Sequence, residues 1–191
     1  WVTPDTSVGV MDDWLVMCGT NRGQRAYVDG VNRANGDRNG ASNTHDVYLG
    51  INYAQGCVDG CSHVSDWAVA EVMTWTRSLS DAEMVQVTEY LRSVTLGVTI
   101  TISPMNDVHA WFESRNAGAT WPSSVGSLVG EVVGGQVEVK TESGHGADAP
   151  VRALHGGTTA KFDFGLALPG DTWTLCTVSR YTGTTRERII M

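Results

Sequence analysis

The sequence has little of several features that define large classes of proteins. No apolar run approaches the roughly 20 residues that a membrane-spanning helix requires, so we expect no membrane insertion. Lys and Arg number 13 against 21 Asp and Glu, which gives a formal charge of -8, and the basic residues are scattered. Nucleic acids and anionic membranes attract clustered positive charge, so we expect neither as a partner.

Cysteine is scarce, and its spacing argues against a metal site. Cys18, Cys57, Cys61 and Cys176 form an even set without the paired C-x-x-C spacing of a zinc ribbon. Two disulfides in a secreted protein are therefore favoured, although four cysteines allow three connectivities. We expect an extracellular protein, either secreted or held at a cell surface.

What is present is mostly strand-forming sequence. Residues 25–28 alternate in character, Asp29-Gly30 suits a two-residue hairpin turn, and the chain resumes at Val31. In the run 66–75 we expect Ala68, Ala70 and Val72 to share one face, with Val69, Glu71, Met73 and Trp75 on the other. A strand that is apolar on both faces belongs inside a layered structure, which predicts an all-β sandwich.

One helix is predicted. Ser80 and Glu83 have the spacing of a capping box, and Met84, Val87 and Leu91 recur at helical spacing. We expect a short amphipathic helix from residue 81 to about 93, lying on the sandwich. Ser103-Pro104 then marks a break, so residues 96–106 are expected to be a linker or a seam.

A family resemblance connects these segments. YVDG at 27–30, VYLGINY at 47–53 and SDWAVAEVMTWTRSLSDAE at 65–83 are similar to the second half of a laminin-G-like, concanavalin A-like jelly roll. HAWFESRNAG at 109–118 and the runs VRALHGGTTAKFDFG and DTWTLCTVSRYTG further on resemble the first half of that family's domain. The resemblance covers most of the chain and implies a jelly-roll β-sandwich.

The order of the two halves is reversed relative to that family. Residues 1–95 resemble the second half and residues 107–191 the first half, with the breakpoint near Pro104. The chain is therefore either a circularly permuted domain, in which the halves form one sandwich, or a window across two tandem repeats. We favour tandem repeats, since a repeat protein cut to one period can begin at any point.

The resemblance also suggests a cysteine pairing. Pentraxins, another branch of the superfamily, join a strand like TLCTVSRYT to the strand before the hairpin, and Cys176 and Cys18 occupy those places here. This implies a bridge from Cys18 to Cys176 and leaves Cys57 and Cys61 to close a short loop. Buried free thiols at Cys18 and Cys176 are the alternative.

No catalytic set is evident in the sequence. Retaining glycosidases need two nearby carboxyl groups, usually alternating on one strand, and Glu71 has no carboxylate two residues away. We expect Glu71 to be a structural hydrogen-bond acceptor. His63 near Asp66 reads as part of a polar loop, and we expect His145 and His155 to lie at Gly-rich turns. The chain is predicted not to be an enzyme.

Ligand contacts are the remaining possibility. We expect no cofactor; calcium is conceivable at loop oxygens but solvated turns are favoured, the candidates being Asp12, Asp13, Asp37, Asn39 and Asp59. Aromatic rings can stack on sugars, and the side chains expected to be available are Trp1, Trp111, Trp121 and Tyr53, with Asp59 nearby. Trp14, Trp67, Trp75 and Trp173 fit strand patterns and are expected in the core.

Two functions are therefore expected from the sequence. The first is a structural repeat of an extracellular fibre, cell-wall or cell-surface assembly, in which sandwiches associate with neighbouring repeats or copies, including by exchange of strands. The alternative is a lectin-like module that binds glycans.

Overall fold

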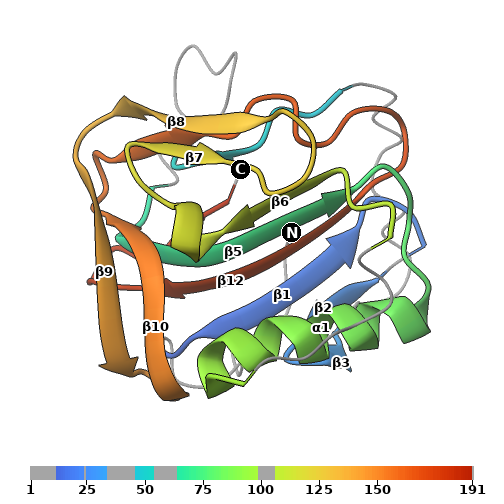
Figure 1. Cartoon of the computed structure of the whole chain (residues 1–191), viewed down its shortest axis with the longest axis horizontal. Helices are drawn as coiled ribbons and strands as arrows, with labels where there is room; N and C mark the ends of the chain where they lie inside the picture. Colours follow the sequence, from blue (N-terminus) through green and yellow to red (C-terminus); the bar gives the residue numbers. More distant parts are fainter. Residues whose placement is uncertain (1–11, 24, 34–45, 54–63, 99–105, 191) are drawn as a thin grey trace.

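The protein folds as an all-β sandwich with one helix. A computed structural model describes residues 12–23, 25–33, 46–53, 64–98 and 106–190. Two antiparallel sheets pack face to face, and the helix covers the outer face of the larger sheet (Figure 1). This arrangement confirms the predicted fold class.

The larger sheet has eight strands in the order β3-β2-β1-β12-β5-β10-β9, with β6 also paired to β5. Its strands are β1 (Leu15–Thr20), β2 (Ala26–Val28), β3 (Val31–Asn32), β5 (Trp67–Trp75), β6 (Ala110–Glu113), β9 (Val137–Gly144), β10 (Ala147–Gly156) and β12 (Thr174–Tyr181).

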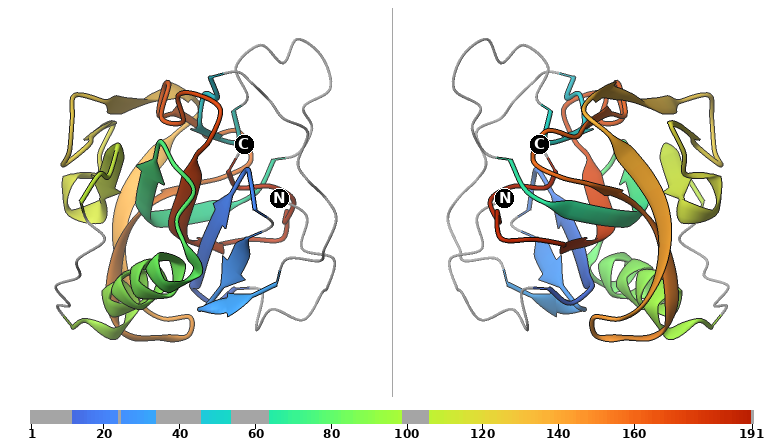
Figure 2. Two further views of the ribbon diagram at one scale, coloured as in Figure 1. Left: turned by 90° about the vertical axis from the view of Figure 1, so that its right-hand side faces the viewer. Right: turned by 90° about the vertical axis from the view of Figure 1, so that its left-hand side faces the viewer.

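The smaller sheet has four strands in the order β4-β11-β8-β7. Its strands are β4 (Gly50–Ile51), β7 (Thr120–Pro122), β8 (Val129–Gly134) and β11 (Lys161–Asp163). In Figure 1 it lies above the larger sheet, while the helix lies below, and the side views in Figure 2 show the same order of layers.

Helix α1 (Asp81–Leu96) begins where its sequence predicts. The Ser80 side chain accepts a hydrogen bond from the Glu83 backbone, the Glu83 side chain bonds back to Ser80, and the predicted capping box is confirmed. The helix continues to Leu96, about one turn beyond the predicted end, and stops at Gly97, whose φ of 67° suits glycine. The expected linker therefore begins later than residue 96; residues 99–105 lie outside the described part.

The predicted hairpin is also present. Strands β2 and β3 pair across Asp29 and Gly30, whose φ angles are 48° and 83°. These positive values are those of a tight hairpin turn, and they explain why Asp-Gly is found here.

Strand β5 crosses the middle of the molecule and is buried along its whole length. The predicted strict alternation is wrong because the pairing with β12 shifts by one residue: Glu71 faces Val178, but Val69 faces Ser179. This bulge at Ala70 places Ala68, Ala70 and Met73 in the core under α1, while Val69 and Val72 face the smaller sheet.

Each face of the larger sheet has its own apolar core. The inter-sheet core is dominated by aromatic rings, including Phe112, Phe162 and Phe164, with centroids 4.7 Å apart for Phe112 and Phe164. Trp121 belongs to this core and is 0 % exposed, so its expected exposure is wrong. Trp67 also lies there, whereas Trp14 and Trp75 lie in the helix-side core under α1.

A disulfide joins Cys18 of β1 to Cys176 of β12, as the pentraxin-like placement implied. The two cysteines face each other directly in the β1–β12 pairing, and both are 0 % exposed. Cys57 and Cys61 lie outside the described residues.

The two sequence segments on either side of residues 99–105 share one sheet. Strand β12 from the second segment lies between β1 and β5 from the first, and β5 also pairs with β6 and β10. Strand exchange with a neighbouring copy is thus not needed to pair these strands. Among the described residues, no helix is long and apolar enough to cross a membrane.

Candidate functional site

Two buried carboxyl groups meet on the helix-side face of the larger sheet. Glu71 lies in the middle of β5 and Glu113 at the end of β6, and the two residues are direct partners in the antiparallel pairing. They are 5 % and 6 % exposed, respectively. Side chains of directly opposite residues are neighbours, so like charges here would repel each other.

This pair corrects an expectation from the sequence. The sequence has no carboxylate two residues from Glu71 on the same strand, which predicts that no carboxyl pair forms. The partner instead comes from β6, across the strand pairing. Glu71 does accept hydrogen bonds, as expected, but it also has an acidic neighbour.

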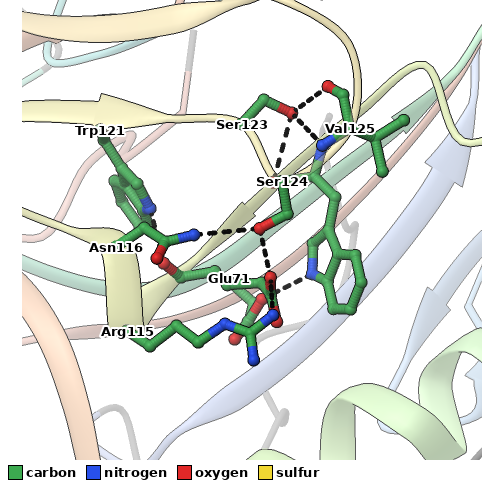
Figure 3. A network of polar contacts seen from close by, with 9 residues as sticks. Glu71, Arg115, Asn116, Trp121, Ser123, Ser124 and Val125 are labelled. Atoms are coloured by element: carbon green, nitrogen blue, oxygen red, sulfur yellow. Dashed lines mark hydrogen bonds and ion pairs between the residues drawn. The ribbon is translucent and has the colours of Figure 1, made fainter.

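Polar groups from the segment after β6 surround Glu113. The Arg115 guanidinium donates to its Oε2 atom at 2.6 Å, and the Ser124 hydroxyl donates to the same oxygen. Asn116 Nδ2 in turn donates to Ser124 Oγ at 3.0 Å. Figure 3 shows Asn116 reaching toward Ser124, with Arg115 below them. The Arg115 side chain is 72 % exposed, so the network extends from the buried pair to the surface.

Glu71 is held without a cation bonded to it among the described residues. Trp111 Nε1 donates to its Oε2 atom at 2.9 Å, and the Ser114 backbone also hydrogen-bonds to this carboxyl group. Burial raises the pKa of Glu71 to about 8, with repulsion from Glu113 adding to the effect and the hydrogen bonds from Trp111 and Ser114 opposing it. Glu71 is therefore largely protonated at neutral pH.

The backbone around the pair is fixed by further hydrogen bonds. Trp121 Nε1 donates to the Glu113 carbonyl at 2.8 Å, Ser123 Oγ accepts from the Trp111 N–H at 2.8 Å, and Arg152 Nε donates to the Ser114 carbonyl at 3.0 Å. These bonds tie β6 and the short 3-10 helix η2 (Ser114–Asn116) to β7, to the 123–125 turn and to β10.

An aromatic contact closes the site on the side of α1. Tyr90 of α1 packs edge-on against Trp111, with ring centroids 5.8 Å apart. Both rings are half-buried. Burial and the negative charges of Glu71 and Glu113 raise the pKa of Tyr90. The Tyr90 hydroxyl is therefore neutral at physiological pH.

A second polar cluster lies on the same face of the sheet, at β9, β10 and β12. Arg180 of β12 donates to the Glu142 carboxylate of β9 and lies over the Trp14 ring at 5.4 Å. His155 Nε2 is 3.8 Å from Glu142 Oε2. His155 is a buried residue of β10, so its expected place in a loop is wrong; His145 does lie at the turn between β9 and β10, with a φ of 56°.

Charges of opposite sign dominate this second cluster. Burial opposes ionisation of Glu142, but the hydrogen bond from Arg180 and the charges of His155 and Arg180 outweigh it and lower the pKa of Glu142. Burial, together with repulsion from Arg180, lowers the pKa of His155, although Glu142 opposes this shift. Three buried polar atoms of this cluster have no hydrogen-bond partner, namely Trp14 Nε1, His155 Nε2 and Arg180 Nε.

The ligand-binding residues expected from the sequence are not gathered in one place. Trp111 lies in the site around Glu71 and Glu113, whereas Trp121 is buried beneath it with its indole N–H bonded to backbone. Tyr53 is half-buried just after β4, on the smaller sheet. Trp1 and Asp59 lie outside the described residues.

No metal centre is found among the residues that the structure describes. This part of the chain contains no group of three or more His, Cys, Asp and Glu side chains able to hold a metal ion. Of the calcium candidates, Asp12 is instead paired with Arg186, at 2.7 Å. Asp37, Asn39 and Asp59 lie outside the described residues.

Comparison with family models, with curated proteins and with solved structures found no match to this chain.

Proposed function

We propose that this chain is a non-catalytic structural module of an extracellular assembly and that it is related to laminin-G-like domains. The observation that carries the proposal is the Cys18–Cys176 bridge between β1 and β12. A disulfide between strands separated by 158 residues persists in an oxidising compartment, and bridges that close long loops stabilise a fold by about 2–5 kcal/mol.

The layout of polar groups supports a structural role. The Oε2 atom of Glu71 accepts from Trp111, the Oε2 atom of Glu113 accepts from Arg115 and Ser124, and Arg115 forms an ion pair with Glu113 on the exposed side. Such a pair connects β5, β6 and η2 and leaves little of either carboxylate for a substrate. A module that must survive outside the cell benefits from this cross-linking of its strands.

Self-association is the second part of the proposal. Val129 and Val133 project from β8 on the outer side of the smaller sheet and are 53 % and 42 % exposed. We propose that these two side chains form part of the surface through which copies of the chain associate.

The proposal is tested on the native protein and on the purified chain. Peptide mapping without reduction is expected to find Cys18 linked to Cys176 in protein from its natural source. Sedimentation over a range of concentrations is expected to show reversible association. Free thiols in the native protein would contradict an extracellular module, and a monomer at every concentration would contradict assembly.

Carbohydrate binding is a second candidate, favoured by the surface next to the site. Half-buried Trp111 lies close to exposed polar side chains from η2 and the following turn, namely Arg115, Asn116 and Ser124. An aromatic ring beside hydrogen-bonding groups is the usual composition of a sugar-binding surface. Binding on a glycan array that is lost in W111A and kept in Y53A would support this function, and an array without binding would contradict it.

A further inference from the structure

The pairing of β5 with β6 places two acids opposite each other where water is largely excluded. Glu71 and Glu113 are register partners, and their exposed fractions are 5 % and 6 %. Two buried carboxylates on directly opposite residues cannot both carry charge without a large cost, because repulsion grows as the surroundings become less polar. One cation, Arg115, is close enough to neutralise one of them.

The contacts distinguish the two acids. Glu113 receives the guanidinium of Arg115 and the hydroxyl of Ser124, both typical partners of an ionised carboxylate. Glu71 receives the Trp111 indole N–H and the Ser114 backbone, and no cation bonds to it among the described residues. The ion pair therefore belongs to Glu113, and Glu71 is the acid that retains a proton.

We propose that Glu71 and Glu113 form a one-proton carboxyl pair that fastens β6 and η2 to β5 and releases them when the proton is lost. The titratable or charged groups facing Glu71 are Glu113 of β6, Arg115 of η2 and Tyr90 of α1. Tyr90 stays neutral, so the single positive charge of Arg115 faces one carboxylate before proton loss and two afterwards.

The direction of the pH effect follows from proton binding. The pKa of Glu71 is raised from 4.5 to about 8, so the folded chain binds this proton more tightly than the unfolded chain. The resulting stability is complete below about pH 4.5, falls as the pH rises, and is gone above about pH 8. Over this window the unfolding equilibrium constant should rise by about three orders of magnitude from this group alone.

The Trp111 indole N–H reports the proton directly, because it donates to Glu71. In a nuclear magnetic resonance titration from about pH 6 to about pH 10, its resonance is expected to move with a midpoint near 8. The Trp121 indole is an internal control, since it donates to the Glu113 backbone carbonyl, which does not titrate. A Trp111 resonance that does not move, or that moves together with that of Trp121, would overturn the proposal.

A variant tests the link to stability. In E71Q the Trp111 titration is expected to vanish, and urea denaturation is expected to lose the steep fall in stability between about pH 5 and about pH 8. The matched control is E131Q, which removes an exposed carboxylate from β8 and should keep the wild-type pH dependence. An E71Q protein with the wild-type pH dependence would contradict the proposal, and if E71Q does not fold, the wild-type titration alone decides.

Discussion

The helix-side face of the larger sheet carries two polar clusters, and the charge of the buried carboxyl groups is compensated differently in each. Around Glu71 and Glu113, two acids face each other and the balance is completed by a proton and by Arg115. Around Glu142, the carboxylate pairs with buried Arg180 beside His155, so opposite charges balance without a bound proton.

The consequence is an opposite dependence on pH. The first cluster loses stability as the pH rises toward about 8, because the unfolded chain releases the Glu71 proton that the folded chain retains. The second loses stability as the pH falls, because the pKa values of Glu142 and His155 are both lowered in the folded chain. The two clusters together favour a window of greatest stability on the acidic side of neutrality.

The largest expected difference between the clusters is in the stability lost when the arginine of each cluster is replaced. The Arg180 side chain is 5 % exposed, so R180M leaves Glu142 without its buried cation and should cost about 3 kcal/mol. The Arg115 side chain is 72 % exposed, and water can replace it, so R115M should cost about 1 kcal/mol. Urea denaturation at neutral pH measures both losses, and equal losses would contradict this difference between the two clusters.

A smaller loss of stability is expected when Glu142, the acid of the second cluster, is replaced. Its pKa is lowered, so the stability from Glu142 is present above the unfolded value of 4.5 and is lost as the pH falls through the folded value. E142Q should therefore cost about 1–2 kcal/mol at neutral pH and flatten the loss of stability in acid.

The matched control for E142Q is E138Q, on the same strand. The Glu138 side chain is 62 % exposed and pairs with exposed Lys140, so its replacement should change stability by less than about 1 kcal/mol. If E142Q loses as much stability as wild type when the pH falls, the sensitivity to acid would instead be assigned to His155.

The smallest effect is a shift of one titration midpoint. E113Q removes the repulsion on Glu71 but leaves its burial, the larger cause of its raised pKa. The midpoint of the Trp111 resonance should move below 8 and remain above 4.5. A midpoint that stays at the wild-type value would show that the two carboxyl groups do not interact.

Local features of the fold could be predicted because neighbouring residues encode them. Ser80 and Glu83 satisfy each other at the start of α1, and Asp29-Gly30 accepts the positive φ angles of the hairpin. The Cys18–Cys176 pairing came from a resemblance in motif placement, and it is present between β1 and β12.

The candidate site was missed for a physical reason. Glu71 and Glu113 are 42 positions apart in the sequence, and only the antiparallel register of β5 and β6 makes them partners. The bulge at Ala70 also changes which residues of β5 share a face, and no residue in the run 66–75 signals it. In the same way, Trp121 and His155 lie in irregular or Gly-rich sequence, but strand pairing buries both.

The sequence by itself determined the all-β class, the helix start and the tight turn, since these depend on alternation, capping and backbone freedom over a few residues. Tertiary structure alone decided which charges face each other, because that depends on strand register and on how much water each neighbour excludes. For this protein, the tertiary structure decided that Glu71 and Glu113 form a pair.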